Sequence, residues 1–104
     1  LRIIPGYIAN VNEPHMTALV RQVAADLLGA AHVREGELEM GGEDFSYFAR
    51  QAPGCMFSLG AATPGEPPRP HHNPHFDVDE DCLPIGTALL AETAMRFLQQ
   101  ASKP

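Results

Sequence analysis

Apolar residues recur at helical spacing in two stretches of the chain. Across residues 16–28 they follow the i, i+3, i+4, i+7 pattern of an amphipathic helix, and Gly29 supplies the C-terminal stop. Just before this stretch, Asn12 can cap the helix, and Pro14 is tolerated in the first turn because its missing N–H is not needed there. The pattern therefore predicts one well-bounded helix near the start of the chain.

The second stretch predicts a long final helix from about Leu83 to Gln100. Its polar stripe is narrow and consists of Glu92, Arg96, Gln99 and Gln100. Because the rest of its surface is apolar, we expect this helix to be buried on most sides.

Shorter elements are expected before the first helix and between the two helices. Residues 2–9 read as a short kinked strand, residues 31–40 as one or two extended pieces, and residues 55–60 as a buried strand. Residues 43–50 predict a short helix with acidic residues at its N-terminal end, which Pro53-Gly54 terminates. Strands that alternate with helices favour an α/β fold in layers.

Composition adds a constrained loop to this map. Ten prolines and nine glycines occur among the 104 residues, and they concentrate between positions 53 and 74. Residues 62–70 carry too many prolines for a helix or a central strand. A loop of about a dozen residues without secondary structure is typically functional or disordered.

Charge and hydrophobicity exclude several classes of protein. A hydrophobic content of 44% and a charged content of 19% are globular values, and 104 residues fit one domain. The net charge is −6 and the arginines are scattered, so we expect neither a nucleic-acid nor an anionic-membrane partner. No apolar run approaches the ~20 residues of a membrane-spanning helix.

Cys55 and Cys82 are too few for a disulfide framework, and they read as buried free thiols of a cytoplasmic protein. The chain also lacks a starting methionine and a signal-peptide pattern. We therefore expect a processed product or an excised piece of a longer protein.

Residues 71–81 form the one dense cluster of metal-ligand types, with three histidines and several acids. Neutral imidazoles and carboxylates are the usual ligands of zinc, manganese or cobalt. The alternative is solvated surface, with Asp79 and Glu80 capping the final helix. His15 and His32 lie beside element starts, where structural roles are expected.

Other catalytic patterns are weak or absent. The acids Glu43 and Asp44 could perform acid–base chemistry, but charges at a helix N-terminus are the more common role. The sequence contains no Gly-x-Ser-x-Gly elbow and no glycine-rich phosphate loop, since Gly41-Gly42 stands alone.

Three segments, in order, resemble the metal-dependent amidohydrolase and peptidase family of hippurate hydrolases, N-acyl-amino-acid amidohydrolases and indoleacetyl-amino-acid hydrolases. Residues 40–48 (Met-Gly-Gly-Glu-Asp-Phe-Ser-Tyr-Phe) are similar to its Met-Gly-x-Glu-Asp-Phe box, and residues 52–60 to its Pro-Gly…Leu-Gly strand. Residues 72–80 resemble the histidine-bearing loop before the last helix, and residues 7–14 the return from the lid domain.

The resemblance implies a partial three-layer zinc-peptidase-like catalytic domain, α/β in class, with strands flanked by helices. Residues 1–8 would be the tail of the lid or dimerisation domain, and residues 9–104 the C-terminal segment of the catalytic domain. The implied activity is a metallopeptidase or amidohydrolase reaction: two divalent ions, zinc or manganese, assist cleavage of amide bonds in N-acyl amino acids or small peptides. His72 alone carries over as a metal ligand, and Glu43 and Asp44 only as residues near the site. No catalytic residue carries over.

The family draws its other ligands and its general base from an N-terminal half with a His-x-Cys-Gly-His-Asp-type box, which this sequence lacks. We therefore expect the isolated chain to be inactive, and to self-associate or to pair with the missing half. One alternative is a non-enzymatic module of the same descent that binds metal or a partner. Another is an interaction domain without metal.

The resemblance selects His72, rather than His71 or His75, because His72 lies two positions before Pro74. Proline also pushes Asn73 toward extended geometry, so that neighbouring side chains alternate in direction. On this basis we expect His71 to face away from His72.

Overall fold

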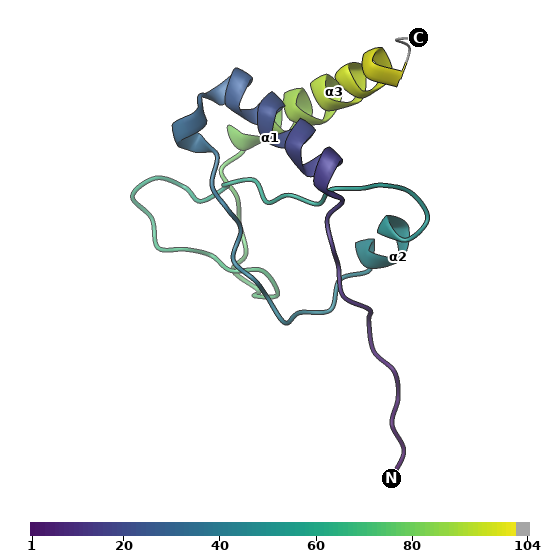
Figure 1. Cartoon of the computed structure of the whole chain (residues 1–104). Helices are drawn as coiled ribbons and strands as arrows, with labels where there is room; N and C mark the ends of the chain where they lie inside the picture. Colours follow the sequence, from purple (N-terminus) through teal and green to yellow (C-terminus); the bar gives the residue numbers. More distant parts are fainter. Residues whose placement is uncertain (102–104) are drawn as a thin grey trace. The chain divides into compact units, whose positions relative to one another are not determined.

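The computed structural model describes residues 1–101, which divide into two compact units. The boundary along the chain lies between Phe57 and Ser58. The first unit contains α1 (Pro14–Leu28), the short 3₁₀ helix η1 (Ala30–His32) and α2 (Phe45–Ala49), and the second contains α3 (Cys82–Ala101) (Figure 1). The rest of the described chain is irregular.

Helix α1 confirms the first predicted helix, but its cap differs from the prediction. Glu13, and not Asn12, occupies the N-cap, where its carboxylate accepts a hydrogen bond from the Met16 N–H at 2.7 Å. At the other end Gly29 adopts a φ of 88°, and its N–H donates to the Ala25 carbonyl at 2.8 Å, so the predicted stop is confirmed.

Asn12 instead joins the start of α1 to a distant part of the first unit. Its amide donates to the Met56 carbonyl at 2.7 Å and accepts from the Met56 N–H at 2.9 Å. Next to this pair, the Glu13 N–H donates to the Gly54 carbonyl at 2.8 Å. The Asn12 side chain thus makes the pair of bonds that a neighbouring main chain would make, which leaves the capping role to Glu13.

The capping role of Glu13 predicts a pH-dependent contribution to stability. Hydrogen bonds from the backbone N–H groups of His15 and then Met16 hold the pKa of this carboxyl below its ordinary value. The ionised cap therefore stabilises the fold fully above the ordinary pKa, and the contribution disappears as pH falls through the lowered pKa. We expect Glu13→Ala to lower the midpoint of thermal unfolding at neutral pH.

The matched control is Glu37→Ala, because Glu37 is exposed and lies outside any helix. Melting curves followed by circular dichroism from pH 7 to pH 2 should show the difference between wild type and Glu13→Ala vanishing at low pH. A difference that persists unchanged at pH 2 would contradict this role.

The predicted strands do not form within residues 1–101, which contain no assigned strand. Residues 30–32 form η1, so the start of the predicted extended stretch at 31–40 is helical instead. The segment 55–60 is not buried, since Met56 is exposed and Phe57 and Leu59 are half-buried. A strand needs a neighbour to pair its N–H and C=O groups, and an extended pattern does not supply that neighbour.

Helix α2 is shorter than the predicted helix at 43–50. The Glu43 carboxylate accepts a hydrogen bond from the Phe45 N–H at 2.9 Å, so an acid does lie at the N-terminal end as expected. Asp44 makes no side-chain cap bond. The helix buries Ser46, while Tyr47 and Phe48 are exposed.

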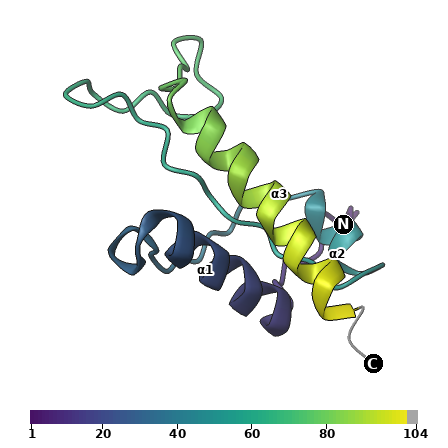
Figure 2. The same cartoon turned by 90° about the horizontal axis from the view of Figure 1, so that it is seen from above.

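Helix α3 confirms the predicted final helix and runs without interruption (Figure 2). The expectation of burial on most sides is wrong for the described chain, because only Cys82 and Leu89 are buried among its apolar residues. The larger exposed ones are Leu83, Ile85, Leu90, Met95, Phe97 and Leu98. Among the helices of the described part, none is long and apolar enough to cross a membrane.

Candidate functional site

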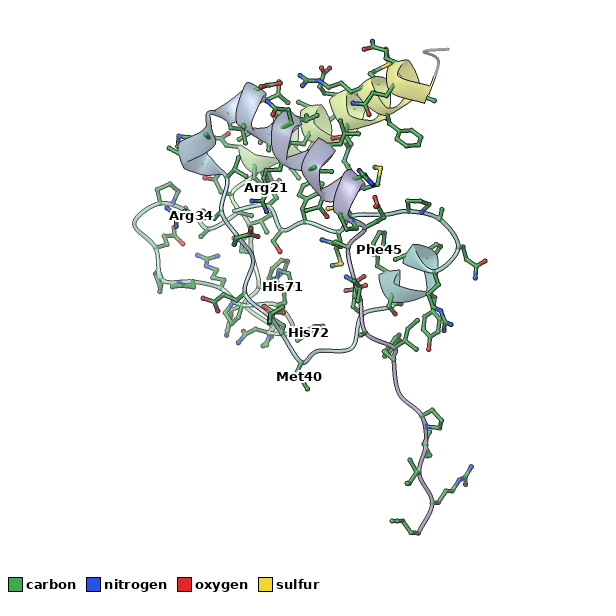
Figure 3. All side chains as sticks on the ribbon, in the orientation of Figure 1. Arg21, Arg34, Met40, Phe45, His71 and His72 are labelled. Atoms are coloured by element: carbon green, nitrogen blue, oxygen red, sulfur yellow. The ribbon has the colours of Figure 1, made fainter. Side chains whose placement is uncertain are left out.

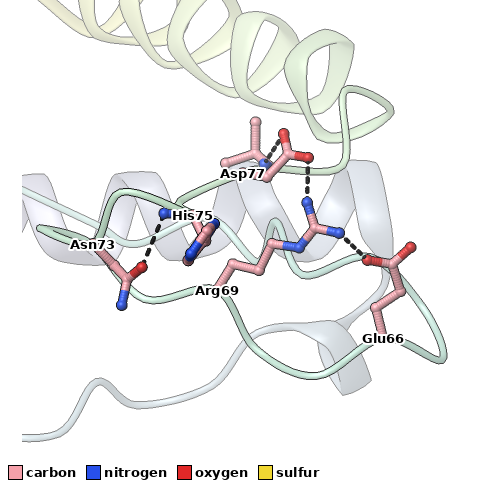
Figure 4. Close-up of polar contacts among 6 residues, drawn as sticks. Glu66, Arg69, Asn73, His75 and Asp77 are labelled. Carbon is pink, nitrogen blue, oxygen red and sulfur yellow. Dashed lines mark hydrogen bonds and ion pairs between the residues drawn. The ribbon is translucent and has the colours of Figure 1, made fainter.

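The histidine cluster lies on a loop whose ends are joined. The Asp79 N–H donates to the Ala61 carbonyl at 2.9 Å and closes the loop just before α3 begins. Inside the loop, the Arg69 guanidinium forms ion pairs with Glu66 at 2.6 Å and with Asp77 at 2.7 Å (Figure 4). These ion pairs connect the part of the loop before the three histidines to the part after them. The proline-rich segment is therefore an ordered loop that presents the cluster.

Asn73 organises the turn at the tip of this loop. Its side-chain oxygen accepts a hydrogen bond from the His75 N–H at 2.9 Å (Figure 4). Its main-chain carbonyl accepts from the Phe76 N–H, also at 2.9 Å. Asparagine commonly makes this kind of local turn, and its two hydrogen bonds hold the backbone of residues 73–76.

His72 occupies an unusual backbone position directly before this turn. It is the one residue other than glycine with a positive φ, 59°, in the described chain. That left-handed region costs free energy for a residue with a Cβ, and such residues cluster at functional sites. The side chain is exposed, so the turn presents the imidazole to its surroundings.

The neighbouring imidazoles do not alternate as the sequence suggested. The ring centroids of His71 and His72 lie 6.4 Å apart with their planes 75° apart (Figure 3). The expectation that His71 faces away from His72 is therefore wrong. The left-handed φ at His72 turns the chain, and alternation holds only for extended backbone.

His71 has a different environment from His72. Its ring packs edge-on against Phe76, with centroids 5.0 Å apart and planes at 87°. It also lines a cavity of about 170 Å³ inside the loop, together with Phe76, Arg69 and neighbouring prolines, whereas His72 does not line this cavity. His71 is thus partly used in packing the loop.

Glu43 and Asp44 belong to the first unit, and His72 belongs to the second. Glu43 is half-buried and engaged with the Phe45 N–H, and Asp44 is exposed. Within residues 1–101, no three or more His, Cys, Asp and Glu side chains gather into a group that could hold a metal ion. The placement of Glu43 and Asp44 near a metal site stays a prediction.

Sequence reasoning missed Arg69, which it treated as one of several scattered arginines. The available signal was Glu66, three residues earlier, but that spacing is informative only in a helix, and prolines exclude a helix there. The ion pair with Asp77 depends on the path of the whole loop.

The chain belongs to the peptidase family M20/M25/M40, whose family model matches residues 2–96. It is 38% identical to YhaA of Bacillus subtilis, named as an amidohydrolase, over 90% of this chain and 24% of that protein.

Two further relatives cover similar shares. An IAA-amino acid hydrolase of Arabidopsis thaliana, ILR1-like 2, is 37% identical over 89% of this chain and 21% of its own length. Thermostable carboxypeptidase 1 of Saccharolobus solfataricus is 36% identical over 88% of this chain and 23% of its own length. The chain thus spans less than a quarter of the length of each of these relatives.

Proposed function

We propose that this chain is the C-terminal segment of the catalytic domain of a dinuclear metal hydrolase that cleaves amide bonds of N-acyl amino acids or small peptides. The observation that carries the proposal is the family match over nearly the whole chain, with relatives named as an amidohydrolase, amino-acid-conjugate hydrolases and carboxypeptidases. Hydrolysis of an amide bond next to an amino acid is the reaction that we propose on the basis of these names.

We propose His72 as the metal ligand that this segment contributes. Its imidazole is of the type that zinc and manganese bind, it is exposed, and its left-handed backbone directly precedes the turn that Asn73 stabilises. A divalent ion supplies Lewis-acid activation of the amide carbonyl and of the attacking water. The loop of this chain supports that chemistry by fixing where His72 emerges, and the other ligands come from outside these residues.

The segment 1–8 is proposed as the tail of a lid domain, and the segment from residue 9 as part of a three-layer α/β catalytic domain. The exposed extended segments are consistent with strands whose neighbours lie in the larger part of the protein.

The two free cysteines are consistent with a cytoplasmic location.

The proposal is tested on the complete protein that contains this chain. Hydrolysis of hippurate, N-acetylmethionine and a small dipeptide should be measured before chelation, after chelation, and after zinc or manganese is restored. Loss of turnover on chelation and its return with metal are expected. Hydrolysis that persists in metal-free protein would contradict a metal hydrolase, and failure to cleave any of these substrates would contradict the proposed substrate class.

The surface of α3 predicts that the isolated chain self-associates. Leu83, Leu90 and Phe97 lie seven residues apart on one stripe of the helix and are 57%, 63% and 47% exposed. An apolar stripe of this length favours contact with a second copy or with the missing half. Light scattering over a concentration series should show a mass that rises above the monomer.

Leu90→Glu should shift that association to higher concentration, because it places a charge in the middle of the stripe. Gln99→Glu is the matched control, since it adds the same charge to the same helix at an exposed polar position. A wild-type chain that remains monomeric at every concentration would contradict the prediction.

A further inference from the structure

The rings of Tyr7 and Tyr47 join the start of the chain to α2. Their centroids lie 5.9 Å apart, and their planes are tilted by 57°. The ring of Tyr7 also lies against the backbone of Gly42, because a Cβ built on Gly42 would stand 2.7 Å from the Tyr7 Cδ2 atom. Tyr7 therefore contacts the chain on both sides of Glu43 and Asp44.

Space, and not backbone conformation, disfavours a side chain at position 42 while the Tyr7 ring keeps its place. Its φ is not in the positive region, so the backbone there is open to any residue. The three atoms nearest to a Cβ at position 42 all belong to the Tyr7 ring. The adjacent Gly41 has no atom within 4 Å of the position that a Cβ would take. The two glycines thus differ in their contact with Tyr7.

Tyr7 stands at a boundary in the first unit. The residues before it are exposed, with Ile3 at 79% and Ile4 at 75%. The residues after it are anchored, since Asn12 bonds to Met56 and the Glu13 N–H bonds to Gly54. A movement of the preceding chain therefore reaches Tyr7 before it reaches any of these hydrogen bonds.

We propose that Tyr7 is a positioning residue that couples the chain before it to the Glu43–Asp44 segment. With the ring seated between Gly42 and Tyr47, the segment is held at both ends, and the Glu43 carboxylate stays on the Phe45 N–H at 2.9 Å. A displacement of the preceding chain that lifts the ring releases both ends together. The consequence for hydrolysis rests on the proposed function, whereas the coupling itself concerns only residues 1–57.

The glycine pair tests the coupling without altering Tyr7. The chain has two tyrosines and no tryptophan, so the tyrosine band of the near-ultraviolet circular dichroism spectrum reports on Tyr7 and Tyr47 alone. Gly42→Ala should reduce that band and shift the Phe45 amide resonance in a ¹H–¹⁵N spectrum. Gly41→Ala should leave both signals as in the wild type, and far-ultraviolet spectra should show equal helix content in both variants.

A second pair changes the ring itself. Tyr7→Ala should shift the Phe45 amide resonance, and Tyr7→Phe, which keeps the ring, should not. In the complete enzyme, Tyr7→Ala should lower kcat several-fold with unchanged metal content, and Tyr7→Phe should retain the wild-type kcat. A Phe45 amide resonance at its wild-type position in both Gly42→Ala and Tyr7→Ala would overturn the coupling. Absence of any hydrolase activity would overturn the proposed function and leave the spectroscopic test intact.

Discussion

Replacing His72 in the complete enzyme is expected to remove metal and turnover together. Substitution of a residue that merely orients a metal ligand costs about 10- to 100-fold in metal affinity or activity. Loss of a ligand should therefore lower kcat/KM by more than about 100-fold. Two variants should be compared, His72→Ala and His72→Asn, with metal content and hydrolysis of an N-acyl amino acid measured on the same samples.

The variant His72→Asn distinguishes a role of the imidazole as a ligand from a role of residue 72 in turning the backbone. Asparagine accepts the left-handed conformation more readily than alanine does, so the φ of 59° at position 72 is better tolerated in this variant. If the role of residue 72 is only to turn the chain, His72→Asn should retain activity. If the imidazole is a ligand, both variants should lose metal.

The neighbouring histidines are the controls. His75→Ala removes a side chain from a turn whose hydrogen bond uses the main-chain N–H of residue 75, so the turn is expected to survive. His71→Ala removes the edge contact with Phe76 and should lower thermal stability slightly while metal content is retained. Full metal and activity in His72→Ala, with both lost in His71→Ala or His75→Ala, would show that the wrong histidine was chosen.

The helices could be predicted from the sequence because their signals are local. The apolar spacing of α1, its proline at the start and Gly29 at its end lie within one stretch of chain, and every hydrogen bond of the helix closes inside it. The cap was predicted at the wrong residue for a non-local reason. The Asn12 side chain is hydrogen-bonded to the main chain of Met56, 44 residues away. The spacing of residues around Asn12 does not indicate this distant partner.

The strands could not be predicted to the same degree because pairing is a property of two segments. An extended pattern indicates that a segment can pair, while the partner decides whether it does.

The candidate site likewise depends on contacts between residues that are distant along the chain. The loop composition pointed to residues 71–81, but the left-handed backbone of His72 and the Arg69 tie to Glu66 and Asp77 arise from the folded path of the loop.

The isolated chain is expected to show no hydrolysis of N-acyl amino acids, even with added zinc or manganese. A catalytic zinc site uses about three protein ligands, and a two-metal site needs more. Residues 1–101 contain no group of three potential ligands. We therefore expect an ion bound at His72 in the isolated chain to lack the further protein ligands that a catalytic site needs.

The measurement is the release of glycine from hippurate and of methionine from N-acetylmethionine, with the His72→Ala chain as the control for adventitious metal chemistry. Equal, background rates in the two chains are expected at every metal concentration.

Turnover in the wild-type chain clearly above that of His72→Ala would mean that the chain builds a complete site, for example by association of copies that each contribute donors. Because the stripe on α3 predicts such association, the assay should be repeated with Leu90→Glu. A rate that falls with the loss of self-association would locate the extra ligands in a second copy, and a rate that does not fall would locate the whole site within one chain.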